Sequence, residues 1–201
     1  MEELPSRIQL VDRRNGEQCD ADLVELTRKL AARGIDGKWW KLTGELLSRP
    51  ADEGDHHWAW RKLVGEHHNH LAWHFVACQT ADGEIQGAAG YRIDYRSVLV
   101  PGAGSVYVDR IAVAPRNRPW LARNPLYMGI GVGLVLRVVC HSYVLGLGGR
   151  ISLISLPSER TRQFYERRGF TRLSEDDDGM VEYEMDEEAA QKWLQQAGYL
   201  Q

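Results

Sequence analysis

Three glycines alternate with apolar residues near the middle of the chain, at Gly129, Gly131 and Gly133. They follow a loop rich in Arg, Asn and Pro, and they open an apolar stretch that runs to Leu147, where two further glycines are a typical helix stop. The first N–H groups of a helix have no intrahelical partner, and the macrodipole adds about half a positive charge there. Because glycines let an anion approach those groups, the arrangement predicts a phosphate-binding helix start.

Two familiar phosphate motifs do not match this glycine group. A dinucleotide fingerprint requires Gly or Ala where the chain has Leu134, and it also requires a tight turn directly after the strand. Here residues 116–128 separate the preceding predicted strand from the first glycine. No Gly-Lys-Ser/Thr follows, so the P-loop is excluded as well. A helix that packs closely through small residues remains the alternative explanation of the glycines.

The charge pattern around the glycines favours an anionic ligand. From residue 110 to residue 158 the chain has no Asp or Glu but six arginines, whereas the whole chain carries a net charge of −3. In such a block each arginine can pair with phosphate and no carboxylate repels it. Buried strands that exclude acids would produce the same pattern, and this alternative stays open.

Length and composition are those of an ordinary globular domain of 201 residues, of which 43% are hydrophobic and 26% charged. The three widely spaced cysteines make no disulfide framework, and the first residues resemble no export signal. The longest apolar stretch is interrupted by Arg137 and His141, so a membrane span is not expected. We therefore expect a reduced, cytoplasmic protein.

Periodicity and turn residues predict a mixed sheet with helices on both sides. Strands are predicted over residues 7–11, 71–80, 85–98, 105–114, 151–156, 170–173 and 180–185. Helices are predicted from Asp20 or Asp22 to about Arg33, over 37–48 and 57–68, from the glycine group to about Leu147, and over 158–168 and 187–196. No repeat or linker divides the chain.

Several short motifs stand in one order along the second half of the chain. They are Ile111-Ala112-Val113-Ala114-Pro115, then Leu126-Tyr127-Met128-Gly129-Ile130-Gly131, and later Ser158-x-x-Thr161-x-x-Phe164-Tyr165-x-x-x-Gly169-Phe170. In order and spacing, residues 84–185 resemble the GNAT superfamily of acetyl-CoA-dependent N-acetyltransferases. That family has a strand ending in hydrophobic-x-Val-x-Pro, then Gln/Arg-x-x-Gly-x-Gly/Ala opening a helix, and later Asn-x-x-Ala-x-x-Phe-Tyr-x-x-x-Gly-Phe.

The chain departs from the family pattern at three positions and in one loop. Leu126 replaces the usual Gln or Arg, Ser158 the usual Asn, and Thr161 the usual Ala. The loop before the glycines is longer than usual, and its Asn117-Arg118 and Asn124-Pro125 pairs resemble a bacterial branch of the family. These departures leave phosphate binding in place, because backbone N–H groups provide it.

The resemblance implies an α/β (α+β) fold, with a GNAT-type mixed, mostly antiparallel sheet of about six to seven strands flanked by helices on both faces. It implies a single N-acetyltransferase domain over residues 1–201. Within this domain, residues 84–185 would form the acyl-CoA-binding core and residues 1–80 the acceptor-side portion.

The resemblance also implies acetyl-CoA as co-substrate, with no metal. The backbone of residues 111–113 would pair with the pantetheine amides, and the N–H groups of residues 127–132 would hold the pyrophosphate. Each loop arginine has a solvated position as its alternative. The expected cofactor contacts are Ile111, Ala112, Val113, Arg116, Arg118, Arg123, Tyr127, Met128, Gly129, Ile130, Gly131, Val132, Ser158 and Phe164.

Two residues are the expected catalytic groups. By resemblance Tyr165 is the general acid for the departing thiolate, and its alternative is a core tyrosine that closes the cofactor tunnel. Asp109 is the only acid on its face of the strand that starts at residue 105, and the family often has a carboxylate on this strand. Its alternative is an ion pair with Arg110, Arg92 or another arginine. A reaction with an amine that is already partly deprotonated needs no dedicated base.

The segment 56–74 is rich in His and Trp, but its spacing fits no known metal motif. A solvated or substrate-lining tract is expected there, and one of its histidines as the base stays open. Four tryptophans are expected to be mostly packing residues: Trp39, Trp40, Trp58 and Trp60.

The predicted activity is that of an acyl-CoA N-acyltransferase, moving an acetyl group to a primary amine of a small molecule, peptide or protein by direct attack. The alternative is a non-catalytic acyl-CoA-binding sensor or regulator. A member directed at nucleic acid, such as a toxin acetylating aminoacyl-tRNA, is disfavoured by the overall acidity and by the acidic run 175–188. A bacterial source is expected and a homodimer is left open.

Overall fold

The computed structural model describes residues 3–41 and 53–200, which divide into two compact units. The described residues of one unit are 3–4, 91–110 and 135–200, and those of the other are 5–41, 53–90 and 111–134. We call them the C-terminal unit and the N-terminal unit. This division differs from the predicted one at residues 80–84, and the single domain over 1–201 stays a prediction.

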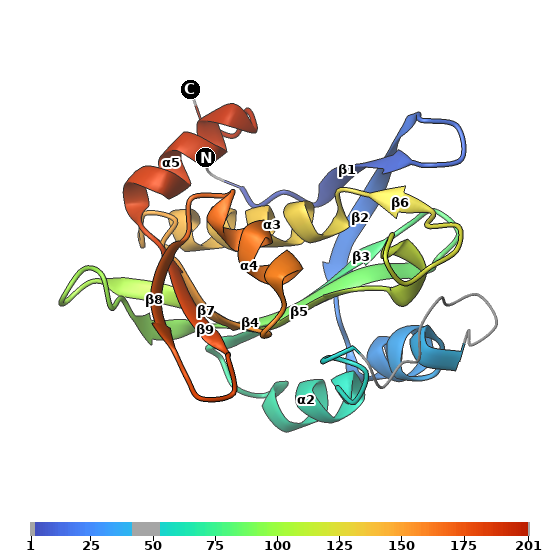
Figure 1. The fold of residues 1–201 in the computed structure, drawn as a ribbon, viewed down its shortest axis with the longest axis horizontal. Helices are drawn as coiled ribbons and strands as arrows, with labels where there is room; N and C mark the ends of the chain where they lie inside the picture. Colours follow the sequence, from blue (N-terminus) through green and yellow to red (C-terminus); the bar gives the residue numbers. More distant parts are fainter. Residues whose placement is uncertain (1–2, 42–52, 201) are drawn as a thin grey trace. The chain divides into compact units, whose positions relative to one another are not determined.

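In the described residues, nine strands hydrogen-bond in the order β6-β1-β2-β3-β4-β5-β7-β9-β8 (Figure 1). The strands β5 and β7 pair in parallel, whereas β1–β2, β1–β6, β2–β3, β7–β9 and β8–β9 are antiparallel. The bounds are β1 Arg7–Asp12, β2 Gln18–Glu25, β3 Trp73–Gln79, β4 Ile85–Arg96, β5 Gly104–Val113, β6 Tyr127–Met128, β7 Ile151–Ser155, β8 Thr171–Glu175 and β9 Val181–Met185. The predicted fold class is confirmed, with a larger number of strands than expected.

The helices agree with the prediction best in the second half of the chain. Their bounds are α1 Arg28–Leu30, α2 Trp60–His67, α3 Ile130–Val144, α4 Glu159–Glu166 and α5 Glu187–Gln196, with a π-helical turn at Ala31–Asp36 and 3₁₀ turns at Trp39–Lys41 and Pro115–Asn117. Ser158 and Asp186 cap α4 and α5 by accepting the N–H groups of Thr161 and Ala189. Among the described residues, no helix is both long and apolar enough to cross a bilayer.

The helix predicted from Asp20 or Asp22 to Arg33 is wrong in its first half, where the chain forms β2. An Asn-Gly pair ends the turn between β1 and β2, and Gly16 has φ +77°. Such a pair is a strong signal for a β-hairpin, and it indicates strands on both sides of the turn. The two acids lie exposed on the strand, and the helical segment begins only after Thr27, whose hydroxyl accepts the Leu30 N–H.

Two other predictions need comment. Of the helix predicted over 37–48, the described part is the 3₁₀ turn Trp39–Lys41, and residues 42–52 lie outside the described part of the chain. The strand β6 was missed because it has only two residues, Tyr127 and Met128, which pair with Asp12 and Val11 of β1. Two residues are too few to show an alternating pattern.

In the N-terminal unit, helical residues cover both faces of β4. A Cβ on Gly87 would lie 2.5 Å from Ile130 of α3, and one on Gly90 would lie 3.0 Å from Phe75 and 3.5 Å from Leu63 of α2. Figure 1 shows α2 and α3 on opposite sides of the strand. The core on the α2 face is a contiguous cluster of Leu26, Ala31, Ile35, Trp39, Trp60, Val64, Ala77, Ile85, Ala88, Ala112 and Ala114.

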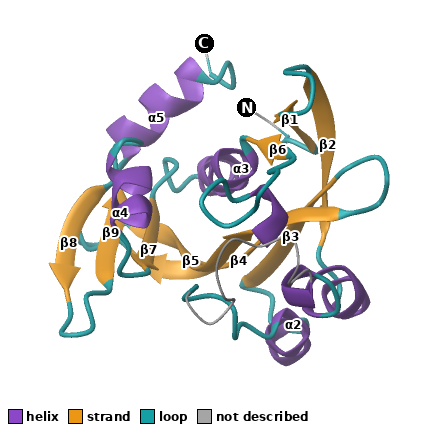
Figure 2. Cartoon of the chain, turned by 45° about the vertical axis from the view of Figure 1, so that its right-hand side comes forward, coloured by secondary structure: helices purple, strands orange, loops and turns teal. Residues whose placement is uncertain are grey.

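In the C-terminal unit, α4 packs on the face of β9 that carries Tyr183 (Figure 2). The other face of β9 carries Glu184, which is fully buried. Its carboxylate accepts hydrogen bonds from the Ser97 hydroxyl, from the Val98 N–H at 2.8 Å and from the Ser152 hydroxyl at 3.2 Å. These bonds hold the turn between β4 and β5. Asp109 lies on β5, the strand that follows this turn.

Candidate functional site

The start of α3 combines a glycine-specific backbone with N–H groups that lack an intrahelical acceptor. Gly129 is exposed and has φ +93°, a conformation that residues with a side chain rarely adopt. The first intrahelical bond runs from the Gly133 N–H to the Gly129 carbonyl at 2.8 Å. The N–H groups of Ile130, Gly131 and Val132 precede it and therefore lack an intrahelical acceptor. The first turn of α3 contains no acidic residue that could compete for them.

Close packing holds this helix start against the sheet. A Cβ added to Gly133 would lie 2.5 Å from Cδ1 of Ile8 on β1, just as a Cβ on Gly87 would meet Ile130. The small-residue alternative from the sequence therefore accounts for Gly133. It does not account for Gly129, where the positive φ and not close packing requires glycine, since the nearest atom to its Cβ would be 3.5 Å away.

A buried amide ties the glycine loop to β4. Asn117 is 4% exposed, its Oδ1 accepts the Tyr127 N–H at 3.1 Å, and its Nδ2 donates to Oε1 of Gln86 at 2.8 Å. The N–H of Tyr127, which we expected to hold phosphate, thus already has an acceptor within the chain. The sequence singled out Asn117 as part of a motif but gave it no role, and its positioning of residue 127 is a structural finding.

Arg118, one of the expected phosphate contacts, is buried in a cluster of ion pairs. It is 5% exposed, and its guanidinium donates to the Val113 carbonyl at 2.9 Å, to Glu53 at 2.9 Å and to both oxygens of Asp55. The Asp55 side chain is itself 7% exposed. This ion-pair cluster clamps the loop that precedes the glycines, and it also occupies the Val113 carbonyl that we expected to face pantetheine.

Arg116 is partly held as well. Its Nε donates to Gln86 at 3.3 Å, and its Nη1 lies 3.4 Å from the Glu84 carboxylate. Arg123 is exposed and has no ion pair within the described parts of the chain. Of the three expected phosphate contacts, Arg123 therefore has the least constrained side chain.

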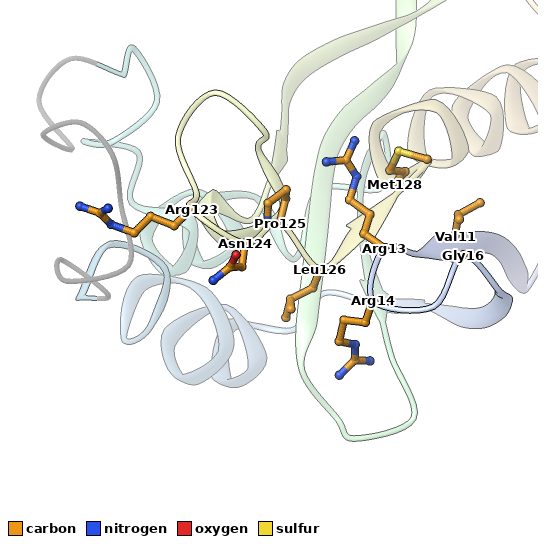
Figure 3. Close-up of a pocket in the computed structure, with 9 residues that line it drawn as sticks. All are labelled: Val11, Arg13, Arg14, Gly16, Arg123, Asn124, Pro125, Leu126 and Met128. Carbon is orange, nitrogen blue, oxygen red and sulfur yellow. The ribbon is translucent and has the colours of Figure 1, made fainter.

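A cavity of about 620 Å³ lies beside the glycine loop (Figure 3). Its lining residues come from the β1–β2 hairpin and from the loop that leads into β6: Val11, Arg13, Arg14, Gly16, Arg123, Asn124, Pro125, Leu126 and Met128. Sequence reasoning missed Arg13 and Arg14 because they precede the acid-free block by about a hundred residues. Only the hairpin, through its pairing with β6, brings them to this loop.

The parallel pair of β5 and β7 stops early. It joins residues 106–108 to residues 151–153, whereas β7 continues to Ser155 along β9. The Ser155 hydroxyl is buried and has no hydrogen-bond partner among the described residues. Such an orphaned polar atom is expected where a polar ligand completes the bonding. At the end of β5, Ala112 is buried while Ile111 and Val113 are half-buried.

Tyr165 lies on α4 inside an aromatic cluster. Its ring is 5.2 Å from Phe170 and 5.7 Å from Tyr183 between centroids, and the residue is 4% exposed. Burial raises the pKa of its phenol above the usual range, an effect that Arg168 opposes. Ser158 caps α4, and Phe164 lies half-buried with the Arg168 guanidinium over its ring at 3.7 Å.

Asp109 lies half-buried on β5, in the C-terminal unit together with Tyr165. Its Oδ2 is 3.3 Å from Nε of Arg110 and makes no hydrogen bond in the described residues. Two positions earlier, Tyr107 lies on the same face and stacks with Tyr95 at 4.8 Å. Burial, with the Asp109 carboxylate as a second cause, raises the pKa of Tyr107. Asp109 is thus partly exposed, and it also forms the ion pair that was the alternative to a catalytic role.

The predicted site residues fall into both units. Asp109, Ser158, Phe164 and Tyr165 lie in the C-terminal unit, and the other predicted residues lie in the N-terminal unit. The histidines of 56–74 are held by local bonds and ring contacts, such as the stack of His67 on Trp73 at 4.1 Å. In the described parts of the chain, no three His, Cys, Asp or Glu side chains are grouped to hold a metal ion.

No family model matches the sequence, and no curated protein matches it either. Solved structures do match. The GNAT domain of S. lividans PAT is 16% identical with a TM-score of 0.56, covering 92% of this chain and 99% of its own. A GNAT acetyltransferase from Listeria monocytogenes is 16% identical with a TM-score of 0.54, covering 88% and 98%. A mutant AtaT toxin, bound to the C-terminus of the antitoxin AtaR and acetyl-CoA, is 16% identical with a TM-score of 0.56, covering 87% and 98%.

These identities are low, so the likeness concerns the fold. The chain has the GNAT acetyltransferase fold, as its sequence motifs predicted.

Proposed function

We propose that the chain is an acyltransferase that moves an acetyl group from acetyl-CoA to a primary amine. The observation that carries this proposal is the start of α3, where three N–H groups without intrahelical acceptors follow a glycine with φ +93°. Such a start is suited to a diphosphate. The glycine motif at this helix start is also part of the resemblance to the GNAT superfamily, which implies acetyl-CoA as co-substrate. One of the similar solved structures, the mutant AtaT toxin, contains acetyl-CoA.

The residues fit a coenzyme A thioester in two respects. The N–H groups of Ile130, Gly131 and Val132 would bind the diphosphate, and no carboxylate lies in the first helical turn to repel it. The end of β5, from Ile111 to Val113, would pair with the pantetheine amides as an added strand through its backbone groups other than the Val113 carbonyl, which already accepts from Arg118.

When bound, acetyl-CoA supplies the activated acetyl group. The amine nitrogen of the acceptor bonds to the carbonyl carbon, the carbon–sulfur bond breaks, and the sulfur leaves as a thiolate. We assign the proton for this thiolate to the Tyr165 phenol, and we assign the removal of the ammonium proton to Asp109 or to water. The raised pKa of Tyr165 keeps the phenol protonated at neutral pH. The same raised pKa makes complete transfer of the phenol proton to the thiolate unfavourable. We therefore expect Tyr165 to contribute less to the rate than a typical general acid does.

A screen for thiol release tests the proposal. Purified protein, acetyl-CoA and a panel of primary amines are expected to release free CoA in proportion to the acetylated product. In Tyr165→Phe we expect kcat to fall about 10²-fold, at the low end of the range for general acid catalysis, with the Kd for CoA unchanged within a factor of about two. An unchanged kcat would remove the acid role and leave the rest of the proposal standing.

The alternative is a sensor that binds acyl-CoA without turnover. Two observations favour it: Tyr165 is buried among aromatic rings, and Asp109 is paired with Arg110. The same screen separates the two functions, because a sensor binds CoA but releases no thiol with any amine. The acceptor, small molecule or protein, is left open by the residues described above.

A further inference from the structure

The cavity between the β1–β2 hairpin and the loop before β6 is not used by the proposed chemistry. Its volume of about 620 Å³ is in the range of about 300–1,000 Å³ that is typical of small-molecule sites. Two of its lining residues, Leu126 and Met128, flank Tyr127 in the sequence, and Met128 directly precedes Gly129. The cavity therefore adjoins the predicted diphosphate loop along the chain.

The hairpin is fixed to this loop through its backbone. Val11 and Asp12 of β1 pair with Met128 and Tyr127 of β6, and the Arg13 N–H donates to the Leu126 carbonyl at 2.8 Å. The backbone of Arg13 is thus held in the lining of the cavity by hydrogen bonds within the protein.

The two arginines of the hairpin differ in what they contact. Arg14 bonds the Asp12 carboxylate through Nε and Nη2, and its guanidinium lies 5.7 Å from the ring centroid of Tyr127. Its charge is therefore already neutralised. The side chain of Arg13 is exposed and has no ion pair or side-chain hydrogen bond to any residue that the structure describes. Figure 3 shows the two side chains pointing to opposite sides of the hairpin, with Arg13 on the side of Met128.

The lining thus presents no carboxylate and two guanidinium groups without an ion pair among the described residues, Arg13 on the hairpin and Arg123 on the loop, beside backbone amides suited to a diphosphate. In coenzyme A, a single ribose separates the 5′-diphosphate from a dianionic 3′-phosphate. We infer that this cavity receives the adenosine end of coenzyme A, and that Arg13 binds the 3′-phosphate. The inference rests on the proposed function, since it assumes that the same molecule occupies the start of α3.

The test compares the affinity of the purified chain for CoA and for 3′-dephospho-CoA by calorimetry. In Arg13→Gln we expect the Kd for CoA to rise about tenfold, the loss of one charge-assisted hydrogen bond, with Arg13→Glu weaker still. Arg13→Gln is not expected to change the Kd for 3′-dephospho-CoA by more than about twofold, because that ligand lacks the contact. Arg61→Ala on α2, which removes the same charge from an exposed position outside the cavity lining, is the matched control.

The outcomes separate the inference from the proposed function. If wild-type protein binds CoA and both Arg13 variants bind it equally well, the assignment of Arg13 is wrong and the acetyl-CoA site stands. An equal loss for the two ligands in Arg13→Gln would also overturn it, because the contact would then be to another part of the nucleotide. If the wild-type protein binds neither ligand, the proposed function fails and the inference fails with it.

Discussion

At the scale of single residues, burial favours the protonated form of several tyrosines in the C-terminal unit. It raises the pKa of Tyr91 to about 12 and that of Tyr165 above its usual range. An unfolded tyrosine ionises near about pH 10, so above that pH the unfolded state loses protons that the folded state keeps. Folding stability present below pH 10 is therefore lost as the pH rises, by about 1.4 kcal/mol per unit for each such group.

The Tyr165→Phe variant checks this linkage without any substrate. Urea unfolding of wild type and variant between about pH 9 and 11 is expected to show a shallower loss of stability in the variant, because the variant lacks the phenol that contributes to the linkage. Parallel pH profiles for the two proteins would mean that the phenol of Tyr165 is not buried in solution.

Single residues also show where the sequence was informative. Glycine at position 129 was expected for the close approach of an anion to the helix start, and the structure adds a positive φ as a separate reason for glycine there. The three loop arginines could not be distinguished, since their different contacts depend on Glu53, Asp55 and Glu84, which are distant in sequence. Arg13 could not be found at all, because nothing near it in the sequence points to an anion.

At the scale of elements, a buried ion pair between Arg118 and Asp55 holds the loop between β5 and β6. Removing one of the two charges is expected to destabilise the protein more than removing both. Asp55→Ala would leave the guanidinium of Arg118 buried with Glu53 as its one remaining acidic partner in the described residues, and removing one partner of a buried pair costs about 3–5 kcal/mol. Urea unfolding measures this cost. The double variant Asp55→Ala, Arg118→Leu is expected to recover part of the loss, since it removes both charges. A double variant that is no more stable than Asp55→Ala would contradict this account of the cluster.

Element prediction succeeded where local signals agreed with the tertiary structure. The helix α5 has the predicted bounds because a capping Asp and a glycine stop mark its ends. It failed at β2, where acids at alternating positions were interpreted as helix caps. That segment is a strand because it pairs with β1, where Arg7 and Asp22 form an ion pair at 2.8 Å. Such pairing cannot be recognised from the sequence of one segment.

At the scale of the whole chain, the sheet order and the motif order agree with one fold. The motifs predicted the class of sheet correctly, because the parallel pair of β5 and β7 follows from a strand–helix–strand order, whereas the other registers come from hairpins. They could not predict the strand count, since β2 and β6 depend on partners elsewhere in the chain. The division of the predicted site between two units was equally invisible in the sequence.

The central claim is that the amides opening α3 bind the diphosphate of coenzyme A, and one pair of variants tests it most directly. Val132 is half-buried at the third position of α3. An acid there suits the helix macrodipole but repels a diphosphate, so Val132→Asp should fold as well as its neutral counterpart Val132→Asn. By calorimetry we expect the Asp variant to bind CoA at least about tenfold more weakly than the Asn variant, since a nearby like charge costs about 1–2 kcal/mol. Equal affinity of the two variants for CoA would contradict the claim.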